Sequence, residues 1–300
     1  MSDITGYCGR DAGGLKEHFL QVNAAIKKTV KGWTNMIIDD NARVITNKMI
    51  IPDHYVMEIH SPDITLKALP GQFLHIKIKD TTSPLLRRPI SIHMRDKEKG
   101  SISILYRVVG IGTQLLSHYK PGDRINIIGP LGSGFPLPAE FKRIAVVGGG
   151  IGTAPLLFLT LEAVNSGRDV LYIEGARCQD ALLLPEHLEN SGCRVMVATD
   201  DGSLGYRGFP TELLKSRLES ESFDAVYACG PKPMLKGIKK LSLEYRIPGF
   251  ISLEERMGCG IGACLSCACK IIVDGGRGAE YRKVCTDGPV FPAEVVIFDE

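Results

Sequence analysis

Short runs of alternating apolar and polar residues fill the stretch 43–128. The clearest of these runs are 55–60, 72–79, 90–93 and 102–109, with turn pairs such as Pro70-Gly71 and Lys99-Gly100 between them. A period of two is typical of strands that bury one face. Only one short helix is expected among them, over 113–119, after a glycine-rich turn. The pattern predicts a small antiparallel β-barrel.

A different pattern begins near residue 141, where apolar runs are separated by segments with helical periodicity. The runs lie at 144–147, 170–174, 194–198 and 225–228. Strands that alternate with helices are typical of a parallel, doubly wound sheet. The second half of the chain is therefore predicted to hold an α/β domain.

These patterns divide the chain into four parts and predict a multi-domain fold of the α/β plus β class. The parts are an N-terminal extension at 1–41, a β-barrel at 42–140, an α/β domain at 141–249 and a small β-rich domain at 250–300. The extension has helical periodicity over 15–31, and we interpret it as a packing or docking arm. The last part has too little core to stand alone without a metal.

Four cysteines in the last part are the most specific chemical signal. Cys259, Cys264, Cys267 and Cys285 have the C-x4-C-x2-C spacing, with a distant fourth cysteine, of plant-type ferredoxins. The residues between the first two are small, so the backbone can approach inorganic sulfides and direct N–H groups at them. The spacing predicts a 2Fe-2S cluster and hence one-electron transfer.

A zinc site is the alternative reading of the same cysteines. Zinc sites usually contain paired C-x2-C motifs or histidines, and no histidine follows His187. We therefore favour the cluster. Cys269 lies two residues beyond Cys267, so on a strand both side chains would share a side, and it could be a neighbour or an alternative ligand.

The barrel carries two candidate anion sites. Arg88-Pro89-Ile90-Ser91 opens a predicted strand and would present a guanidinium and a hydroxyl at the barrel rim. A second group, around the start of the predicted helix, consists of Leu105, Tyr106, Arg107, Gly112 and Thr113. Alone, Arg88 would be interpreted as a solvated rim charge. Two anion sites in one barrel favour a flavin dinucleotide.

The α/β domain carries a second nucleotide signal. A glycine turn between a strand and a helix contains Gly148, Gly149, Gly150, Gly152 and Thr153. Another turn follows a later strand at its carboxyl end and contains Cys229, Gly230 and Pro231. If the nucleotide is a nicotinamide dinucleotide, Cys229 could lie beside its nicotinamide ring, and it is the candidate catalytic residue. The alternative is that Cys229 is an ordinary buried small hydrophobic residue. The segment 200–203 ends another strand and is either an adenosine contact or merely a turn.

Composition bears on the class of partner, the cellular location and the state of the cysteines. The chain has 300 residues with 36 basic and 34 acidic side chains, which indicates neither a nucleic-acid partner nor a membrane-surface role. It has no run of 18 apolar residues and no secretory signal at its start, so we expect a cytoplasmic protein. Nine cysteines with uneven spacing favour reduced thiols and a metal cluster over disulfides.

The order of barrel, doubly wound domain and cluster segment resembles the ferredoxin reductase superfamily. Within it, the chain resembles the electron-transfer subunits of type B dihydroorotate dehydrogenases over about 42–300. The most specific pieces are Arg88-Pro89-Ile90-Ser91, Gly110 to Thr113, the run 254–264 and the run 285–289. The N-terminal 40 residues lie outside this pattern.

The resemblance implies cofactors and a partner. FAD would be held at 88–91, 105–107 and 112–113, a 2Fe-2S cluster by the four cysteines, and NAD at 148–152 and 229–231. The chain would be half of an enzyme in pyrimidine biosynthesis, forming a heterotetramer, two of each subunit, with an FMN-containing catalytic subunit. Electrons would pass from FMN through the cluster and FAD to NAD. The cluster loop is the expected contact surface.

Three alternatives stay open. The same module could serve a hydrogenase or an NADH-dependent ferredoxin:NADP reductase. NADP could replace NAD, because Arg177 follows the second strand of the α/β domain, whereas Glu174 there would prefer a free ribose hydroxyl. A non-enzymatic iron-sulfur sensor would hold the cluster without a working flavin site.

Overall fold

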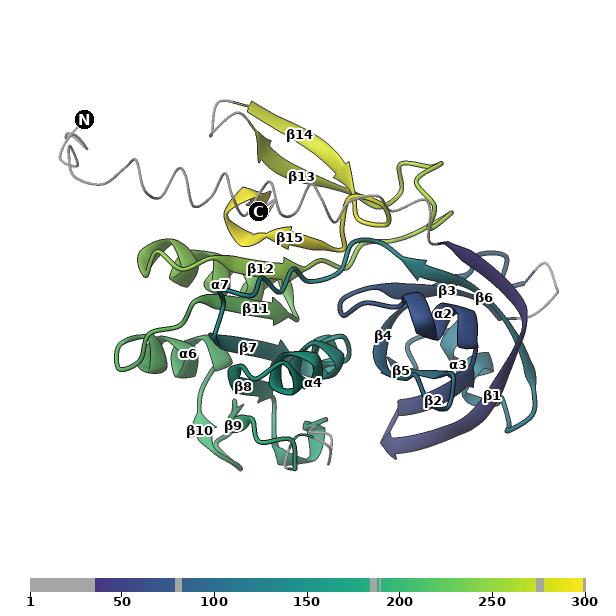
Figure 1. Ribbon diagram of the computed structural model, residues 1–300, viewed down its shortest axis with the longest axis horizontal. Coiled ribbons are helices and arrows are strands. Elements are labelled where there is room, and N and C mark those ends of the chain that lie inside the picture. Colours follow the sequence, from purple (N-terminus) through teal and green to yellow (C-terminus); the bar gives the residue numbers. More distant parts are fainter. Residues whose placement is uncertain (1–35, 79–82, 184–187, 189, 274–277, 299–300) are drawn as a thin grey trace.

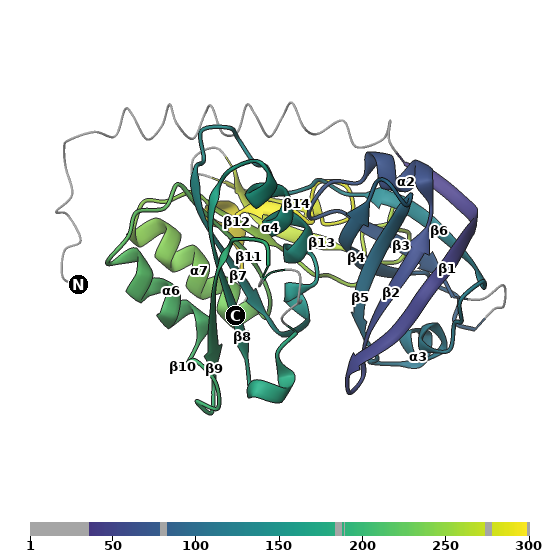
Figure 2. The ribbon, with the colours of Figure 1, turned by 60° about the horizontal axis from the view of Figure 1, so that its bottom comes forward.

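Three β-sheets organise the protein in the computed structural model (Figure 1). The structure describes residues 36–78, 83–183, 188, 190–273 and 278–298. The expected helix at 15–31 lies outside the described residues. The barrel and the α/β sheet lie side by side, and β13 and β14 lie alongside both, as the rotated view in Figure 2 also shows.

A closed barrel of six antiparallel strands forms the first sheet, in the order β1-β2-β5-β4-β3-β6. Its strands are β1 (Ile37–Ile51), β2 (His54–His60), β3 (Phe73–Lys77), β4 (Arg88–Asp96), β5 (Ser101–Arg107) and β6 (Arg124–Leu131). The predicted antiparallel barrel is thus confirmed. Its first strand begins at Ile37, ahead of residue 42, where the sequence placed the boundary.

Among the described residues of the barrel, two α-helices rather than one lie between the strands. The expected helix is α3 (Ile111–Ser117), which begins two residues earlier than predicted. The second is α2 (Pro62–Lys67), so the expectation of a single helix is wrong. Pro62 starts α2 with a preset φ, and Ile64 anchors it in the barrel core. Six residues are too few to show a helical period in the sequence.

The second sheet has seven strands in the order β10-β9-β8-β7-β11-β12-β15. Its strands are β7 (Arg143–Gly149), β8 (Asp169–Ala176), β9 (Arg194–Thr199), β10 (Tyr206–Arg207), β11 (Ala225–Cys229), β12 (Gly249–Ser252) and β15 (Val290–Pro292). The first six run parallel to their neighbours, as predicted for a doubly wound domain. The connecting helices are α4 (Leu156–Asn165), α6 (Pro210–Leu218) and α7 (Lys232–Glu244).

Both faces of this sheet are buried, by alternate residues of each strand. On β7, Ile144 and Val146 belong to the core that contains α4, whereas Ala145 and Val147 belong to the core that contains α6 and α7. Strands covered on both sides read as continuous apolar runs, which is why the sequence revealed them. Helices on both faces leave only the strand ends open for ligands.

The C-terminal segment contributes to the sheet of the α/β domain. Strand β15 adds to it antiparallel to β12, with Ile251 opposite Phe291. The rest of the segment forms a three-stranded sheet of β14 (Gly278–Lys283), β13 (Ala268–Val273) and β16 (Val296–Ile297). One core cluster joins Phe73 of the barrel with Ile251, Cys267, Cys285 and Phe291. The segment therefore gains its core from the other two domains.

The barrel and the α/β domain meet through β4 and α4. The Arg95 guanidinium lies 5.0 Å from the centre of the Phe158 ring and forms an ion pair with Glu162 at 3.1 Å. It also donates a hydrogen bond to the Ala68 carbonyl. One side chain thus connects β4, the end of α2 and α4 across the boundary between the two domains.

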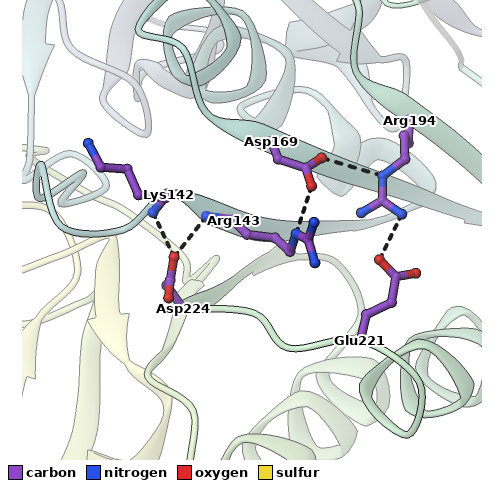
Figure 3. Close-up of polar contacts among 6 residues, drawn as sticks. All are labelled: Lys142, Arg143, Asp169, Arg194, Glu221 and Asp224. Carbon is purple, nitrogen blue, oxygen red and sulfur yellow. Dashed lines mark hydrogen bonds and ion pairs between the residues drawn. The ribbon is translucent and has the colours of Figure 1, made fainter.

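Charged residues gather at the amino ends of the parallel strands (Figure 3). Asp169 at the start of β8 contacts Arg143 of β7 at 2.7 Å and Arg194 of β9 at 3.4 Å. Asp224 accepts hydrogen bonds from the backbone N–H groups of Lys142 and Arg143. These partly exposed ion pairs contribute about 0–1 kcal/mol each. No described helix is long and apolar enough to cross a lipid bilayer.

Because β15 belongs to the sheet of the α/β domain, we expect it to stabilise that domain as well as the C-terminal segment. Replacing Phe291 with alanine removes a ring that is 5% exposed and should cost about 3–5 kcal/mol. We expect the unfolding temperature of the α/β domain and the temperature at which the C-terminal segment is lost to fall together. Circular dichroism measures the first, and limited proteolysis measures the second. Tyr281→Ala is the control, because that ring is 72% exposed and its loss should change stability by at most about 0.5 kcal/mol. An unshifted α/β transition in Phe291→Ala would contradict the shared core.

Candidate functional site

The two turns predicted to bind a nucleotide lie against each other at the carboxyl edge of the parallel sheet. Gly148 at the end of β7 is level with Cys229 of β11, which is level with Ser252 of β12. A Cβ on Gly152 would lie 2.5 Å from the Cys229 carbonyl oxygen. Only glycine permits this approach, so the glycine turn and the turn after β11 form one surface.

The remaining predicted residues of these turns are also brought together. Gly149 packs against Met234 and Pro231, the residue that precedes α7. Gly150 has a φ of +53°, and the Thr153 hydroxyl donates a hydrogen bond to its carbonyl, which closes the turn. The backbone N–H groups of such a turn at a sheet edge can bind a pyrophosphate.

Cys229 is a neutral thiol in this setting. Its desolvated surroundings raise the pKa of the thiol to about 12, and an interaction with the Ser252 hydroxyl opposes this only in part. The thiolate is the nucleophilic form of cysteine, so Cys229 is unsuited to nucleophilic chemistry. Cys229 thus presents a small, partly exposed, neutral side chain at the sheet edge.

Two adjoining suggestions from the sequence change in the structure. The Glu174 side chain is fully buried and accepts a hydrogen bond from the Leu183 N–H, so it does not present a carboxylate to a ribose. Burial raises the pKa of Glu174 to about 7. In the segment 200–203, Asp201 accepts hydrogen bonds from the backbone and hydroxyl of Ser203. That segment has the hydrogen bonding of a turn.

The two predicted anion sites of the barrel converge on one arginine. Gly112 in α3 lies so close to Arg88 at the start of β4 that a Cβ would be 2.6 Å from the guanidinium carbon. The Thr113 hydroxyl accepts hydrogen bonds from the N–H groups of Val109 and Gly110 and so shapes the loop before α3. The structure therefore places the Arg88 side chain against Gly112 at the start of α3, where the guanidinium and the backbone could bind one phosphate group.

The other predicted flavin residues divide into exposed and buried ones. Arg107 is exposed and Ser91 is partly buried at the rim. Leu105 and Tyr106 are buried, and the Tyr106 hydroxyl donates a hydrogen bond to Asn47 while its ring stacks on Tyr55. Burial also raises the pKa of Tyr106. Leu105 and Tyr106 thus belong to the barrel wall, in the part of β5 that pairs with β2. Pro89 and Ile90 lie in β4, with the Ile90 side chain in the barrel core.

The four cysteines of the predicted cluster are brought together by two loops. Cys259, Cys264 and Cys267 lie between β12 and β13, and Cys285 follows β14. The Cys264 N–H contacts the Cys259 sulfur at 3.3 Å, and the Val284 N–H donates to the Cys267 carbonyl. The Lys283 ammonium donates to the Gly262 carbonyl at 2.9 Å. These bonds hold the late loop against the early one.

The electrostatics of the four thiols differ. Hydrogen bonding with the side chain and backbone of Ser266 lowers the pKa of Cys264 to about 6. Burial, followed by the neighbouring Cys267 thiol, raises the pKa of Cys285 to about 12, and Cys259 adds to the rise. All four are free thiols. Within the described ranges, no three His, Cys, Asp or Glu side chains are grouped as ligands of a single metal ion. Four cysteine thiols beside glycine-rich backbone are the donor set that would hold a 2Fe-2S cluster, which binds four thiolates.

Cys269, the spare cysteine, is buried in the core of β13. In the antiparallel register, Cys269 lies opposite Arg282 of β14. Its side chain belongs to the core cluster that contains Cys267 and Cys285. Burial raises the pKa of Cys269 to about 11. Its main contribution is packing beside the cysteine loops.

Sequence reasoning did not identify His75, which lies between the cysteine loop and the barrel. Its ring is 1% exposed, and a Cβ on Gly260 would lie 2.5 Å from its Nδ1 atom. Burial and the Arg87 guanidinium lower the pKa of His75 to about 4, so the ring is neutral near pH 7. The only sequence signal was a histidine between two apolar residues, Leu74 and Ile76, in a predicted strand.

The contact between Gly112 and Arg88 predicts a specific loss of flavin affinity. Gly112→Ala should displace the guanidinium without disturbing the barrel, because a flexible side chain can move aside. Loss of one charge-assisted hydrogen bond, about 1.5–3 kcal/mol, corresponds to an FAD affinity about 10- to 100-fold weaker. Fluorescence titration of the flavin-free protein with FAD measures the change.

Gly110→Ala is the matched control for that variant. Its added Cβ meets nothing within 4 Å, and its φ of 179° suits any residue. FAD affinity should therefore be unchanged. Equal losses in both variants, or none in Gly112→Ala, would show that the Arg88 position does not govern flavin binding.

Comparisons with known proteins agree with these three regions. The chain matches the family model of an oxidoreductase FAD-binding domain at residues 41–135 and that of an oxidoreductase NAD-binding domain at residues 146–240. Residues 254–297 match the iron-sulfur cluster binding domain of dihydroorotate dehydrogenase B. The barrel, the sheet edge and the cysteine loops thus coincide with domains for FAD, NAD and an iron-sulfur cluster.

Curated relatives cover nearly the whole described chain. A dihydroorotate dehydrogenase B (NAD(+)) electron transfer subunit from Desulforamulus reducens is 46% identical over 259 residues, 86% of this chain and 98% of the relative. The Geobacillus thermodenitrificans subunit of the same name is 41% identical over 87% of this chain and 100% of its own length. A solved NADH-dependent reduced ferredoxin-NADP oxidoreductase structure has a TM-score of 0.76 and 29% identity, over 86% of this chain and 90% of that one. The chain belongs to the family of dihydroorotate dehydrogenase B (NAD(+)) electron transfer subunits.

Proposed function

We propose that this chain carries electrons between NAD and an FMN-containing catalytic subunit that oxidises dihydroorotate, in a heterotetramer of two of each subunit. The observation that carries the proposal is the 46% identity with the Desulforamulus reducens subunit over 98% of that protein. A likeness of that extent includes the barrel, the sheet edge and the cysteine loops together. The name of the relative, an electron transfer subunit, implies a partner with the catalytic site.

The three groups supply complementary chemistry when bound: nicotinamide exchanges hydride, an iron-sulfur cluster exchanges single electrons, and flavin exchanges either. The four cysteines 259, 264, 267 and 285 are the proposed ligands of a 2Fe-2S cluster. Arg88 to Ser91, the main chain of 105–107, Gly112 and Thr113 are proposed to hold FAD. Gly148 to Gly150, Gly152, Thr153 and Cys229 to Pro231 are proposed to hold NAD.

The residues themselves bind and orient rather than react. Arg88 provides a fixed positive charge for a phosphate, with its position set by Gly112. The glycine turn after β7 lets backbone N–H groups reach a second pyrophosphate. Cys229, with its raised pKa, offers a neutral surface at the end of β11 and brings no competing nucleophile to the nicotinamide position.

The cysteine loop is the proposed contact with the catalytic subunit. Leu265, between Cys264 and Cys267, is 76% exposed, and Ala263 is exposed beside it. An apolar side chain projecting from a metal-binding loop is suited to bury against a partner. Docking there would bring the partner next to the cysteines.

Reconstitution tests the proposal directly. The purified chain, loaded with FAD and cluster, should oxidise NADH with an artificial dye but show no dihydroorotate oxidation. Addition of an FMN-containing catalytic subunit from the same genome should produce NADH from dihydroorotate and NAD. A chain that never forms a complex with that subunit would refute the assignment.

A second candidate function follows from the structural comparison. The NADH-dependent reduced ferredoxin-NADP oxidoreductase has 29% identity and a TM-score of 0.76, so the same module could serve a ferredoxin-linked partner. Arg177, which is exposed just after β8, could then meet a 2'-phosphate. Preference for NADPH over NADH in the dye assay would favour this second function.

Removing one cluster ligand should separate two activities. In Cys264→Ser we expect loss of the iron-sulfur absorbance and of electron transfer to the partner. NADH oxidation with a dye should persist, because FAD and NAD are held by other domains. Iron content, visible spectra and both assays measure the outcome.

Cys193→Ser is the control for that variant. Cys193 lies just before β9, and its sulfur contacts the Leu188 carbonyl, away from both cysteine loops. Both activities and the iron content should stay at the wild-type level. If Cys264→Ser kept its fold and its FAD and still lost the dye activity, the proposed separation of the two electron routes would be wrong.

A further inference from the structure

His75, in the middle of β3, has a buried ring whose two nitrogens lack hydrogen-bond partners among the described residues. The ring is 1% exposed. Burying a polar group without a hydrogen-bond partner is unfavourable, because the group loses its bonds to water. Native proteins seldom keep such a group unless it serves a bound group or a redox or catalytic role. We therefore expect a hydrogen-bond partner for the His75 ring that is not one of the described residues.

The cysteine loop lies against the His75 ring. A Cβ on Gly260 would be 2.5 Å from Nδ1 and 2.9 Å from Cε1 of His75, so no side chain separates the loop backbone from the ring. Gly260 has a φ of +70°, a conformation that glycine adopts freely. The backbone of Cys259 is close enough to favour a proton on the ring, although it does not meet hydrogen-bond geometry. The ring is thus directed at the first cysteine of the quartet.

The same face of the barrel carries the flavin strand. His75 is directly opposite Pro89 of β4, and Phe73 is directly opposite Ser91. Residues opposite each other in a pleated sheet share a face, so the outer face of β3 and β4 holds His75, Phe73, Pro89 and Ser91 together. Phe73 belongs to the core that also contains Cys267 and Cys285. Leu74 and Ile76 point into the barrel core instead.

The Arg87 guanidinium fixes this part of β3. It donates a hydrogen bond to the His75 carbonyl at 3.1 Å and others to the Asn126 carbonyl and side chain in β6. Arg87 is the immediate neighbour of Arg88, the proposed phosphate contact. His75 therefore lies at the junction of the flavin-binding strand and the cysteine loop.

We propose that His75 is a positioning residue for electron exchange between the cluster and the flavin, and that its buried ring donates an N–H hydrogen bond into the cluster site at Cys259. The proposal rests on the proposed function, since it requires the four cysteines to bind a cluster. Hydrogen bonds to the sulfurs or their surroundings stabilise the reduced, more negative cluster and raise its midpoint potential. The histidine thereby sets the driving force between two groups that it does not itself ligate.

Redox titration of three variants of the full chain tests the inference. His75→Leu removes the donor, His75→Gln retains an N–H donor, and His93→Leu is the matched control. His93 is buried in β4, but its Nδ1 atom bonds the Ala154 carbonyl at 2.7 Å, away from the cysteine loop. Electron paramagnetic resonance of the reduced cluster and flavin absorbance give the two midpoint potentials separately.

We expect the cluster potential of His75→Leu to shift downward, that of His75→Gln to recover part of the shift, and that of His93→Leu to match the wild type. The flavin potential should stay constant in all three. An unchanged cluster potential in His75→Leu, or a shift of the flavin potential instead, would overturn the proposal.

A measurement on the unmodified sequence keeps the test decisive if His75→Leu does not fold. Wild-type protein with 15N-labelled histidine should show a histidine hyperfine coupling to the reduced cluster, and His75→Gln should lack it. A reduced cluster without that coupling would refute the role of His75 alone. A wild-type chain that binds no iron would refute the proposed function with it.

Discussion

The close contact between the outer face of β3 and the cysteine loop is the constraint on which the rest of the structure depends. Phe73 shares a core with Cys267 and Cys285, and Gly260 approaches the His75 ring so closely that no side chain fits between them. Because β3 pairs with β4, this contact places the cysteines beside the strand that begins with Arg88. A chain that passes single electrons from a cluster to a flavin needs such proximity.

The other two domains support that contact. Strand β15 adds the C-terminal segment to the α/β sheet, and Arg95 joins the barrel to α4. The parallel sheet thus has two distinct ends. Its carboxyl edge holds the glycine turn and Cys229, where backbone groups are open to a ligand. Its amino edge, at the opposite ends of the same strands, holds the ion pairs of Asp169 with Arg143 and Arg194.

Much of this plan could be predicted from the sequence, because its signals are local. Alternation gave the barrel strands, continuous apolar runs gave the parallel strands, and cysteine spacing indicated the iron-sulfur domain. Local signals fail where an element is short or depends on distant partners. The six residues of α2 have no detectable period, and the three of β15 become a strand only because β12 lies beside them. Glu174 looked like a ribose ligand from its place at a strand end, but the Leu183 segment covers it.

The candidate site shows the same limit at the level of single side chains. The cysteines could be proposed as ligands because few other sites use that spacing, whereas the glycine turn became a candidate only together with the later turn at Cys229. His75 was not, since a histidine in a strand means little until Gly260, far along the chain, is placed against it. The contact of Gly112 with Arg88 likewise joins two motifs that the sequence could only name separately.

Anaerobic titration of the purified chain with NADH, followed through the flavin and iron-sulfur absorbance bands, tests the central claim that one chain connects NAD to the cluster through FAD. The account predicts that NADH bleaches both bands. Bleaching of the flavin band with an oxidised cluster left unchanged, in protein that contains iron, would contradict it.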